Sequence, residues 1–504
     1  MLFAISDYKQ QEMFDRLNNL YKILEIEPET RLNYLVGQKI GEIKHLQDSQ
    51  PRVKGELMQT LLFLVRPWLK RTIAVSERQK RGKVQYFVYA GTGNQMKSLE
   101  GCVQALSKRG ERFEFMIPEK LISETAVKEL CSPYRFNVAD LLVSNLVLIK
   151  GFARLGRLIS DMPQKMREKH FEGFLHPYLY IAFFLRVLRE SQPEFVVVSN
   201  DHNVDTRSLV AVAHFLGVKT VYMQHASVSP LFPALRFTYA FLDGEKSMRV
   251  YEQCEKNSPG DIASYQKPQV FLSGQKKTLT GGQSKGDHLV GVAVNILDPI
   301  DGILSLVRRL QISNIPVLLR WHPGQKKIDV ERIYAEFGSD SLVQLSDPAK
   351  QHVARFLDRI HTMIAGNSSI HLEAALMGVT TIYFEIVPPS TPDYYGYVRE
   401  KVSTHARSVN ELLDMLVNDN VDREDGREEA IRHYSETYGT PWYGKEGELV
   451  AETLHRISKG QGVDSIYDRV EKSSVFGNAY GLCAIASGDI SGCESEELSP
   501  SMES

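Results

Sequence analysis

Cysteine is scarce in this sequence, and its few cysteines suggest neither a disulfide framework nor a metal site. The chain of 504 residues has an odd number of cysteines without metal-type spacing: Cys102, Cys131, Cys254, Cys483 and Cys493. Such usage is typical of reduced thiols in a cytosolic compartment. The first residues, MLFAISDYKQQEMFDRL, lack the basic segment and long apolar run of a secretion signal. We therefore expect a cytoplasmic protein.

An excess of charge of one sign is lacking as well. The chain has 60 basic and 62 acidic residues and a net charge of −2, so no overall field favours nucleic acid or an anionic membrane. We expect no nucleic-acid partner. The two most apolar stretches, residues 57–69 and 178–188, are too short to span a bilayer. We predict both as buried helices, with a surface that lies on a membrane as the alternative.

Alternating strand and helix patterns divide the chain into two domains, as its length also indicates. Residues 1–80 are predicted as a helical N-terminal extension. The first domain, residues 81–273, has apolar runs typical of buried parallel strands, the last of which should complete its sheet: 84–90, 113–118, 195–200, 219–225 and 239–244. The helical stretches between these runs predict a parallel sheet.

A polar segment rich in glycine, lysine, serine and threonine, residues 274–287, is predicted as the linker to the second domain. That domain, residues 288–458, repeats the pattern with further strands: 288–295, 316–322, 342–347, 362–367 and 380–386. The Ser- and Gly-rich end, residues 459–504, is predicted as a disordered tail. The expected fold class is α/β, with two Rossmann-like parallel-sheet domains.

The segment GNSSIHLEAALMG, which begins at Gly366, has the features of an anion site. A strand ends at Asn367, and Ser368 and Ser369 stand where the next helix begins. The first N–H groups of a helix are unpaired and carry partial positive charge, and two hydroxyls add donors for phosphate. Either serine alone could instead be an N-cap. Glu373, one turn further along the same face, could accept hydrogen bonds from ribose hydroxyls or be a solvated helix charge. The predicted donor site also includes Gly366 and Asn367.

The segment RWHPG, residues 320–324, ends another buried strand. Ligands of open α/β sheets bind at the carboxyl ends of strands. Pro323 disfavours helix for His322, so the imidazole should project from the strand end, where it could donate to a phosphate or help neutralise a leaving nucleotide. A lone histidine there is usually structural, but a Ser-Ser helix start 46 residues later in the same sheet favours a ligand role. Arg320 and Lys326 are nearby cations, or simply solvated charges.

A His-Pro motif followed at this distance by a Ser-Ser motif resembles the GT-B transferases that use cytidine-nucleotide donors. These include the bacterial sialyltransferases, the Kdo transferases of capsule synthesis and the CDP-glycerol glycerophosphotransferases of teichoic acid synthesis. The resemblance implies that His322, Ser368 and Ser369 hold the donor phosphates. It also implies inverting transfer of a nonulosonic or Kdo-type acid from a CMP- or CDP-linked donor to a glycan or lipid-linked acceptor of capsule or lipopolysaccharide. The enzyme would then work in the cytoplasm, at or near the inner membrane.

An inverting transferase needs a group that takes a proton from the acceptor hydroxyl, and strand ends of the first domain offer four candidates. Asp201 and His202 follow one strand, His225 follows the next, and Asp243 follows a third. His225 is similar to a histidine of the glycerophosphotransferases. Asp243 is similar to the carboxylate of the acidic-acidic-Gly motif of sialyltransferases, although Leu242 replaces the first acid, and it could equally be a turn residue. We rank His225 and Asp201 ahead of Asp243.

Metal ligands and cofactor motifs are lacking. The second half has no HExxH motif, paired CxxC motif or DxD-like pair at a strand end, so we expect a metal-independent enzyme without a cofactor. The loop GTGNQ, residues 91–95, is predicted to approach the acceptor or donor closely, with a plain tight turn as the alternative.

Two other hypotheses stay open. A UDP-sugar epimerase or UDP-hexose transferase of the same fold would release UDP or an altered sugar nucleotide, whereas the leading hypothesis requires release of CMP or a nucleoside diphosphate. A non-catalytic scaffold for glycan synthesis is the third hypothesis, and the combined presence of His322, the two serines and Glu373 argues against it.

Overall fold

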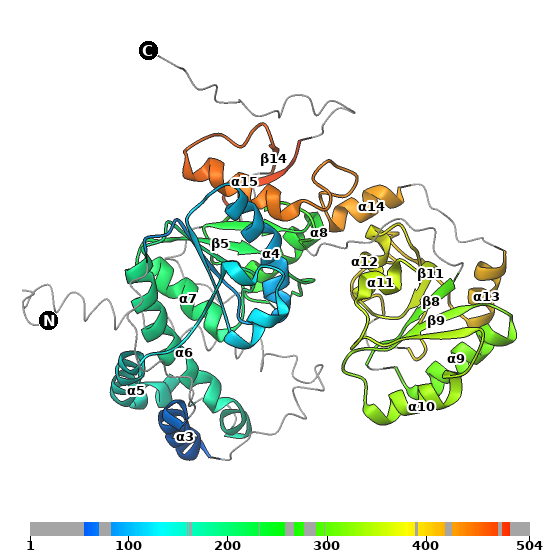
Figure 1. The fold of residues 1–504 in the computed structure, drawn as a ribbon, viewed down its shortest axis with the longest axis horizontal. Coiled ribbons are helices and arrows are strands. Elements are labelled where there is room, and N and C mark those ends of the chain that lie inside the picture. Colours follow the sequence, from blue (N-terminus) through cyan, green and yellow to red (C-terminus); the bar gives the residue numbers. More distant parts are fainter. Residues whose placement is uncertain are drawn as a thin grey trace, which may run out of the picture.

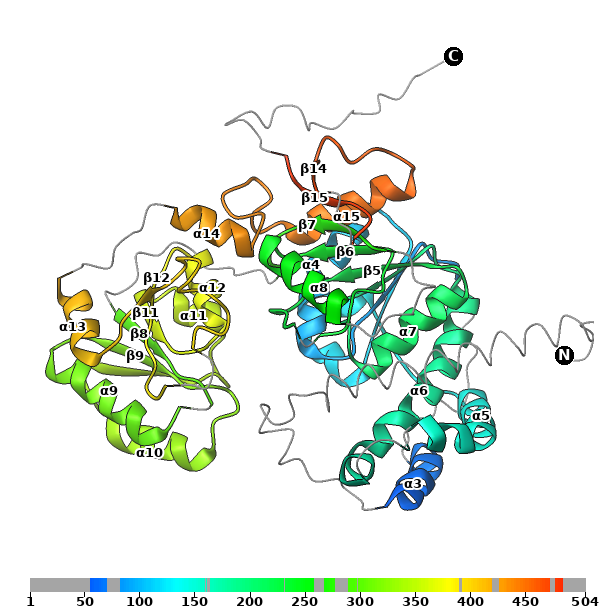
Figure 2. The same ribbon diagram turned by 180° about the vertical axis from the view of Figure 1, so that it is seen from behind.

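A computed structural model of the chain contains two β-sheets flanked by helices (Figure 1). The structure describes residues 55–69, 82–158, 160, 164–230, 232–257, 267–276, 289–296, 298–388, 392–418, 426–471 and 476–483. Each sheet with its helices forms its own body, and α14 (Arg427–Tyr434) lies between the two bodies in opposite views (Figures 1 and 2). This architecture confirms the predicted α/β class with two Rossmann-like domains.

The first sheet has nine strands in the order β14-β15-β7-β6-β5-β4-β1-β2-β3. Its strands are β1 (Tyr86–Tyr89), β2 (Phe113–Ile117), β3 (Cys131–Pro133), β4 (Phe195–Val198), β5 (Lys219–Met223), β6 (Tyr239–Leu242), β7 (Gln269–Leu272), β14 (Tyr467–Glu471) and β15 (Ala479–Leu482). All neighbouring strands are parallel except β14 and β15. The helices around it are α3 (Glu56–Leu69), α4 (Gly93–Lys108), the short 3₁₀ turns η1 (Glu119–Glu124) and η2 (Lys128–Leu130), α5 (Val138–Leu158), α6 (Gln164–Ser191), α7 (Val204–Phe215), α8 (Glu245–Asn257) and α15 (Glu446–Ser458).

The second sheet has six strands in the order β10-β9-β8-β11-β12-β13, and all of them are parallel. Its strands are β8 (Leu289–Ala293), β9 (Val317–Arg320), β10 (Val343–Ser346), β11 (Ile360–Ala365), β12 (Thr380–Tyr383) and β13 (Thr404–His405). The helices around it are α9 (Ile300–Ile312), α10 (Lys327–Phe337), α11 (Val353–Leu357), α12 (Ile370–Leu376) and α13 (Val409–Val417). Buried aliphatic side chains on both faces of the central strands explain their continuous apolar runs.

Each predicted apolar run contains a strand, but the first sheet continues beyond the run at 239–244. β7 pairs with β6 on its far side, so the prediction that this run completes the sheet was wrong. β7 has only four residues, of which three are buried. Its apolar run of three residues, Val270, Phe271 and Leu272, is shorter than the four to eight that mark a buried strand in a sequence.

The chain returns to the first domain after the second. α15 packs against α4, and β15 and β14 extend the first sheet beyond β7. The two helices come so close that a Cβ at Gly447 would lie 2.4 Å from the carbonyl carbon of Gly101. The second domain therefore does not reach 458, and the predicted disordered tail is wrong where β14 and β15 form. The polar composition around these short strands at the sheet edge concealed them. Residues 484–504 lie outside the described residues.

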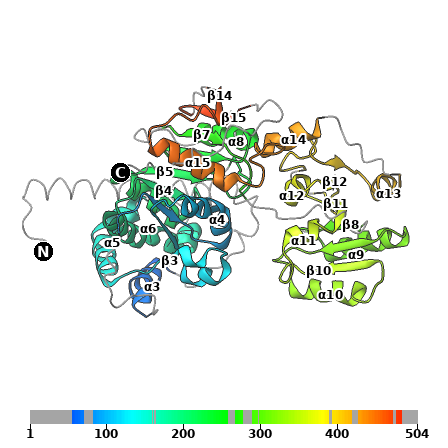
Figure 3. The same cartoon turned by 45° about the horizontal axis from the view of Figure 1, so that its top comes forward.

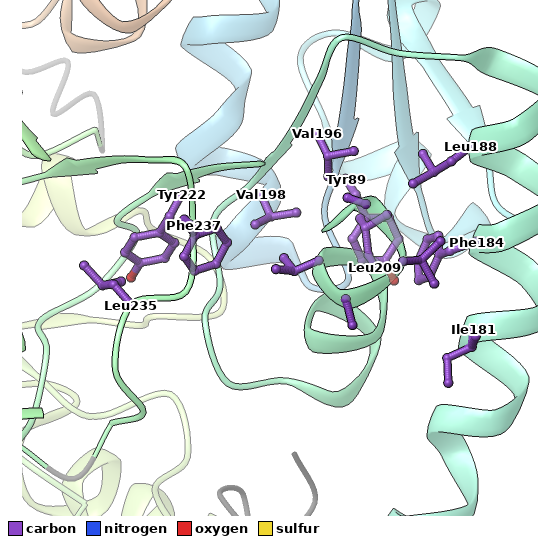
Figure 4. Close-up of a cluster of buried hydrophobic side chains, with 14 of the residues drawn as sticks. Tyr89, Ile181, Phe184, Leu188, Val196, Val198, Leu209, Tyr222, Leu235 and Phe237 are labelled. Atoms are coloured by element: carbon purple, nitrogen blue, oxygen red, sulfur yellow. The ribbon is translucent and has the colours of Figure 1, made fainter. Parts of the chain in front are cut away.

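Aromatic and aliphatic side chains form the core beneath the first sheet (Figure 4). Tyr89 of β1 and Val196 of β4 lie beside Phe184 and Leu188 of α6 (Figure 4). The apolar stretch 178–188 is part of α6, and the side chains that it contributes to this core are buried. The predicted buried helix is confirmed for this stretch.

The predicted N-terminal extension and linker fall largely outside the described residues. Of the extension, α3 is described and packs against α6, with Phe63 in the shared core. The prediction of a buried helix was wrong for its outer face, because Leu57 and Leu61 are exposed. Of the linker, only residues 274–276 are described. None of the four cysteines in the described part of the chain forms a disulfide.

Candidate functional site

In both sheets the strand order reverses beside the first strand, between β1 and β4 and between β8 and β11. At such a point the connections leave in opposite directions, and the carboxyl ends of the two strands border a natural ligand site. Residues 199–203 follow β4, and residues 366–369 follow β11. The topology therefore places Asp201, His202 and the two predicted donor serines at equivalent points of the two sheets.

Asn367 is the centre of a hydrogen-bond network at the carboxyl edge of the second sheet. Its backbone carbonyl accepts from the side-chain amide of Asn295 at 2.7 Å, which joins the ends of β8 and β11 across the reversal. Its side-chain oxygen lies 2.9 Å from both the Tyr383 hydroxyl and the Tyr394 backbone nitrogen. The Tyr383 hydroxyl also contacts the Glu385 carboxylate. Sequence reasoning placed Asn367 here but missed its partners, because no motif marks them.

The predicted donor serines lie at the start of α12. Ser369 occupies the N-cap position with helical backbone angles, and its exposed hydroxyl makes no capping hydrogen bond. The Ser368 hydroxyl lies 3.4 Å from an amide of the first turn, at the limit of a hydrogen bond. Glu373 is only 8% exposed, so it is not a solvated helix charge. Burial lowers the pKa of Arg320, and the nearby charge of Glu373 partly opposes that effect.

His371 lies in the same segment and holds the end of β11. Its Nε2 lies 3.1 Å from the carbonyl oxygen of Ala365 and 3.0 Å from that of Gly366, and its Nδ1 lies 3.1 Å from the Ser403 hydroxyl. Burial lowers the pKa of His371 to about 4, so the neutral ring donates from Nε2 and accepts at Nδ1. This clamp fixes the strand end that leads into the serines. The sequence signal was a histidine inside an otherwise apolar helix, which we did not single out.

His322 follows β9, the neighbour of β8. Its exposed imidazole accepts from the Gly324 backbone N–H at 3.0 Å through Nδ1, which leaves the proton of the neutral ring on Nε2. The adjoining Pro323 is exposed as well. Arg320 is instead buried and donates to a serine of β10 at 2.9 Å. Lys326 is exposed beside the start of α10. Lys326 is therefore solvated, as one of the two alternatives predicted, whereas Arg320 is not.

At the corresponding point of the first sheet, Asp201 and His202 form a hydrogen-bonded pair. One oxygen of the fully buried Asp201 carboxylate lies 2.7 Å from Nδ1 of His202, and the other accepts from the Tyr251 hydroxyl at 2.7 Å. Burial alone would raise the pKa of Asp201, but His202, Tyr251 and the charge of His225 together lower it. The charged carboxylate favours a His202 tautomer with its proton on Nδ1, so Nε2 is the basic nitrogen. Tyr251 lies within α8, away from any strand end in the sequence, and no sequence signal marked it.

His225 and Asp243 follow β5 and β6. His225 is half-buried and close enough to influence the pKa of Asp201. The Asp243 carboxylate lies 3.1 Å from the Lys276 ammonium, and both side chains are at most 5% exposed. Burial lowers the pKa of Lys276, and Asp243 opposes this effect. The structure thus brings Asp201, His202 and His225 together and places Asp243 in a buried ion pair with a lysine that sequence reasoning missed.

The loop GTGNQ packs against the residues after β4. Thr92 accepts from the Gln95 N–H at 3.5 Å, and the Gln95 side chain accepts from the Gly91 N–H at 2.8 Å. A Cβ at Gly91 would lie 2.2 Å from the Asp205 carboxylate, which accepts from the Tyr89 hydroxyl. The close approach of this loop is therefore to Asp205 of the protein itself, and its approach to an acceptor or donor stays a prediction.

Loops of the two domains meet beside these residues. The Tyr394 hydroxyl donates to the Ser229 hydroxyl at 3.1 Å. Ser229 lies in the β5–β6 loop, which also carries His225, and the Tyr394 backbone N–H donates to the Asn367 side chain. α14 packs on α8 of the first domain and on α12 of the second. A continuous series of contacts thus connects the loops that carry the candidate residues of the two sheets.

The two sites offer different chemistry. The second sheet presents the exposed Ser369 hydroxyl, the Ser368 hydroxyl and the His322 imidazole, all able to donate to an anion. The first sheet presents an imidazole oriented by a carboxylate, which is suited to accepting a proton. In the described part of the chain, no three His, Cys, Asp or Glu side chains are grouped so that they could hold a metal ion.

No family model matches this chain, and no curated protein sequence matches it either. Solved structures match it at low identity. A UDP-N-acetylglucosamine 2-epimerase is 12% identical with a TM-score of 0.47, over 75% of this chain and 97% of that chain. A putative UDP-N-acetylglucosamine 2-epimerase from Listeria monocytogenes is 13% identical with a TM-score of 0.49, over 75% of this chain and 98% of that chain. MurG from Acinetobacter baumannii is 10% identical with a TM-score of 0.41, over 74% and 99%.

Proposed function

We propose that this chain is a metal-independent glycosyltransferase of the two-domain GT-B type. It transfers a nonulosonic or Kdo-type acid from a CMP donor to a bacterial surface polysaccharide or glycolipid. The choice of a cytidine donor follows from the resemblance of the His-Pro and Ser-Ser motifs. In this proposal His322, Ser368 and Ser369 hold the donor phosphate, and Glu373 binds the ribose.

One observation supports the proposal: serine hydroxyls able to donate to an anion and an imidazole able to accept a proton follow the strands at the equivalent reversal points of the two sheets. The Tyr394–Ser229 hydrogen bond links the loops that carry them. A transferase needs both groups at one junction, because the acceptor must be deprotonated while the donor phosphate is held. A nucleotide-binding domain alone would need only the second sheet.

His202 is the best candidate for the general base. Asp201 is fully buried, and both of its oxygens have hydrogen-bond partners, so it orients the His202 ring rather than reaching an acceptor. The His202 side chain is 20% exposed. Its Nε2 would take the acceptor proton while the acceptor oxygen attacks the anomeric carbon and CMP departs with the bonding electrons. His225 is the second candidate because it lies near the same carboxylate.

A thermal-shift panel of CMP, CDP, UDP and GDP tests the donor class. A ligand that binds only the folded state at about 100 times its Kd stabilises it by about 2.7 kcal/mol, enough to raise Tm measurably. We expect a shift with CMP, and a weaker one with CDP. A shift with UDP alone would replace the proposal with a UDP-sugar epimerase or hexose transferase. No shift with any nucleotide would favour a non-catalytic scaffold.

Chelation tests the metal-independent mechanism. If the histidine and serine donors suffice to hold the leaving nucleotide, EDTA should leave the release of CMP from CMP-sialic acid or CMP-Kdo unchanged within about twofold. Complete loss of release, restored by adding Mg²⁺ or Mn²⁺, would refute that part of the proposal and leave the donor assignment intact.

A further inference from the structure

The outer face of α3 is apolar, and its inner face carries polar groups. Five large side chains are exposed at helical spacing: Leu57, Met58, Leu61, Leu62 and Val65, at 40–70%. Gln59 and Thr60 are buried on the other side, where the Gln59 side chain accepts from the Glu172 backbone N–H of α6 at 3.0 Å. A helix that covers a core normally shows the reverse arrangement.

α5 also exposes an apolar stripe. Leu141, Leu148 and Leu155 pack inward with at most 2% exposure. A second row faces outward at 39–64%: Val138, Leu142, Val143, Leu146, Ile149 and Phe152. Of the twenty large apolar side chains exposed in the described ranges, eleven lie on α3 and α5. Apolar side chains exposed singly are ordinary, but such a concentration marks a binding surface.

The two stripes belong to one region of the molecule. α3 and α5 both pack against α6, and Phe63 and Leu148 share its buried cluster. In all three views these helices lie at the end of the first domain remote from the second sheet (Figures 1, 2 and 3). The exposed residues of α3 and α5 are called the outer face below. Among the described helices, none is long and apolar enough to cross a bilayer.

The described charges exposed on α3 and α5 are basic, in contrast to the balance of the whole chain. Lys150 and Arg157 of α5 are exposed, whereas the acid of α3, Glu56, is half-buried and that of α5, Asp140, is buried. The whole chain is nearly balanced, with a net charge of −2. An apolar helix face flanked by Lys and Arg is the combination that binds the interface of an anionic bilayer. A second copy of this chain would bring the same positive charge to the contact and would be repelled.

We infer that the outer face of α3 and α5 docks the protein onto the surface of an anionic lipid bilayer. Its leucines and Ile149 enter the boundary between headgroups and acyl chains, and Lys150 and Arg157 contact lipid phosphates. The inference goes beyond the proposed function, and its test uses no nucleotide. A negative result would therefore leave the donor assignment untouched.

Cosedimentation of the full chain with vesicles tests the inference. We expect binding to phosphatidylcholine vesicles that contain about one third phosphatidylglycerol, and binding at least about fivefold weaker without the anionic lipid. Raising the salt from about 0.1 M to about 0.5 M should weaken binding several-fold. The triple variant Leu61→Ser, Leu146→Ser, Ile149→Ser should bind at least about tenfold more weakly than the unmodified chain.

The matched control is the variant Ile312→Ser, Val417→Ser in the second domain, whose side chains are 79% and 67% exposed. It should bind vesicles as the unmodified chain does. Both variants should keep the unmodified Tm, because exposed positions tolerate such changes. Failure of the unmodified chain to bind, or equal binding by the triple variant, would overturn the inference. A lower Tm or an altered elution volume of the triple variant would show instead that residues 1–54 or a second copy cover the face.

Discussion

Acid should destabilise the second domain through His371. This imidazole is fully buried. Its Nε2 lies within hydrogen-bond distance of the carbonyl at the carboxyl end of β11, and its Nδ1 within that of the Ser403 hydroxyl. Burial lowers its pKa from 6.5 to about 4, although two carbonyls and the charge of Asp393 oppose the effect. The neutral ring is thus part of the folded state, and protonation must displace it or charge the interior.

The size and sign of the effect follow from linkage. Above pH 6.5 the ring is neutral in both states, and its contribution to stability is complete. Between pH 6.5 and about 4 the unfolded chain binds a proton that the folded chain does not, so stability falls as the pH falls. Over the whole window the loss amounts to about 3 kcal/mol. Below pH 4 both states are protonated and no further loss comes from this residue.

Urea unfolding at pH 7.0 and pH 4.5 measures the loss. Trp68 and Trp442 are replaced by phenylalanine in every chain compared, so that the fluorescence comes from Trp321, which is 5% exposed in the second domain. The unmodified chain should lose about 2–3 kcal/mol more than His371→Gln between the two pH values. His214→Gln is the matched control, because burial also lowers the pKa of His214 to about 4, but in the first domain. It should leave the pH dependence of the Trp321 signal unchanged.

Equal pH dependence of the Trp321 transition in the unmodified chain and in His371→Gln would refute this reasoning. It would mean that the ring is protonated in the folded state or that acid opens the second domain at another point. A further expectation follows from the position of His371 next to Gly366. Because the ring of the folded chain stays neutral until about pH 4, nucleotide affinity should fall only as the pH approaches that value.

Three other perturbations test the site itself. Ser368→Ala with Ser369→Ala should weaken nucleotide binding by about 2–4 kcal/mol if both hydroxyls donate to phosphate, and calorimetry that shows unchanged affinity would remove them from the site. His202→Ala should lower kcat about 10²- to 10⁴-fold with unchanged nucleotide affinity, whereas full activity would move the base to another residue. Tyr394→Phe should lower kcat several-fold and couple to Ser229→Ala by about 1 kcal/mol in a double-mutant cycle of stability, and additive effects would contradict a direct link.

Much of the fold was predictable because both sheets are buried on two faces. Strands such as β4 and β9 read as continuous apolar runs, and the turns after them carry polar residues. The failures share a physical cause. β7 has an apolar run of only three residues, and β14 lies at the sheet edge, where polar side chains are tolerated, with β15 between it and β7. Their place depends on contacts with strands far away in the sequence.

The candidate site was predictable only where a residue follows a strand. Asp201, His202 and Asn367 stand at such positions, and the structure places them at the two reversal points. Tyr251 and Lys276 could not be found this way, because they reach Asp201 and Asp243 from other elements. Partners of this kind become visible only when packing brings distant segments together.

The return of the chain to the first domain has a consequence for synthesis. Val270 of β7 pairs with Ala479 of β15, whereas β8 to α13 form one uninterrupted stretch. On the ribosome the second domain can therefore be complete while the first sheet still has an open edge at β7 and an uncovered α4. At about 5–20 residues per second, the roughly 60 residues from the end of α13 to β15 take about 3–12 seconds. During it the nascent chain presents an unpaired strand edge, so ribosome-associated chaperones should matter more for the first domain than for the second.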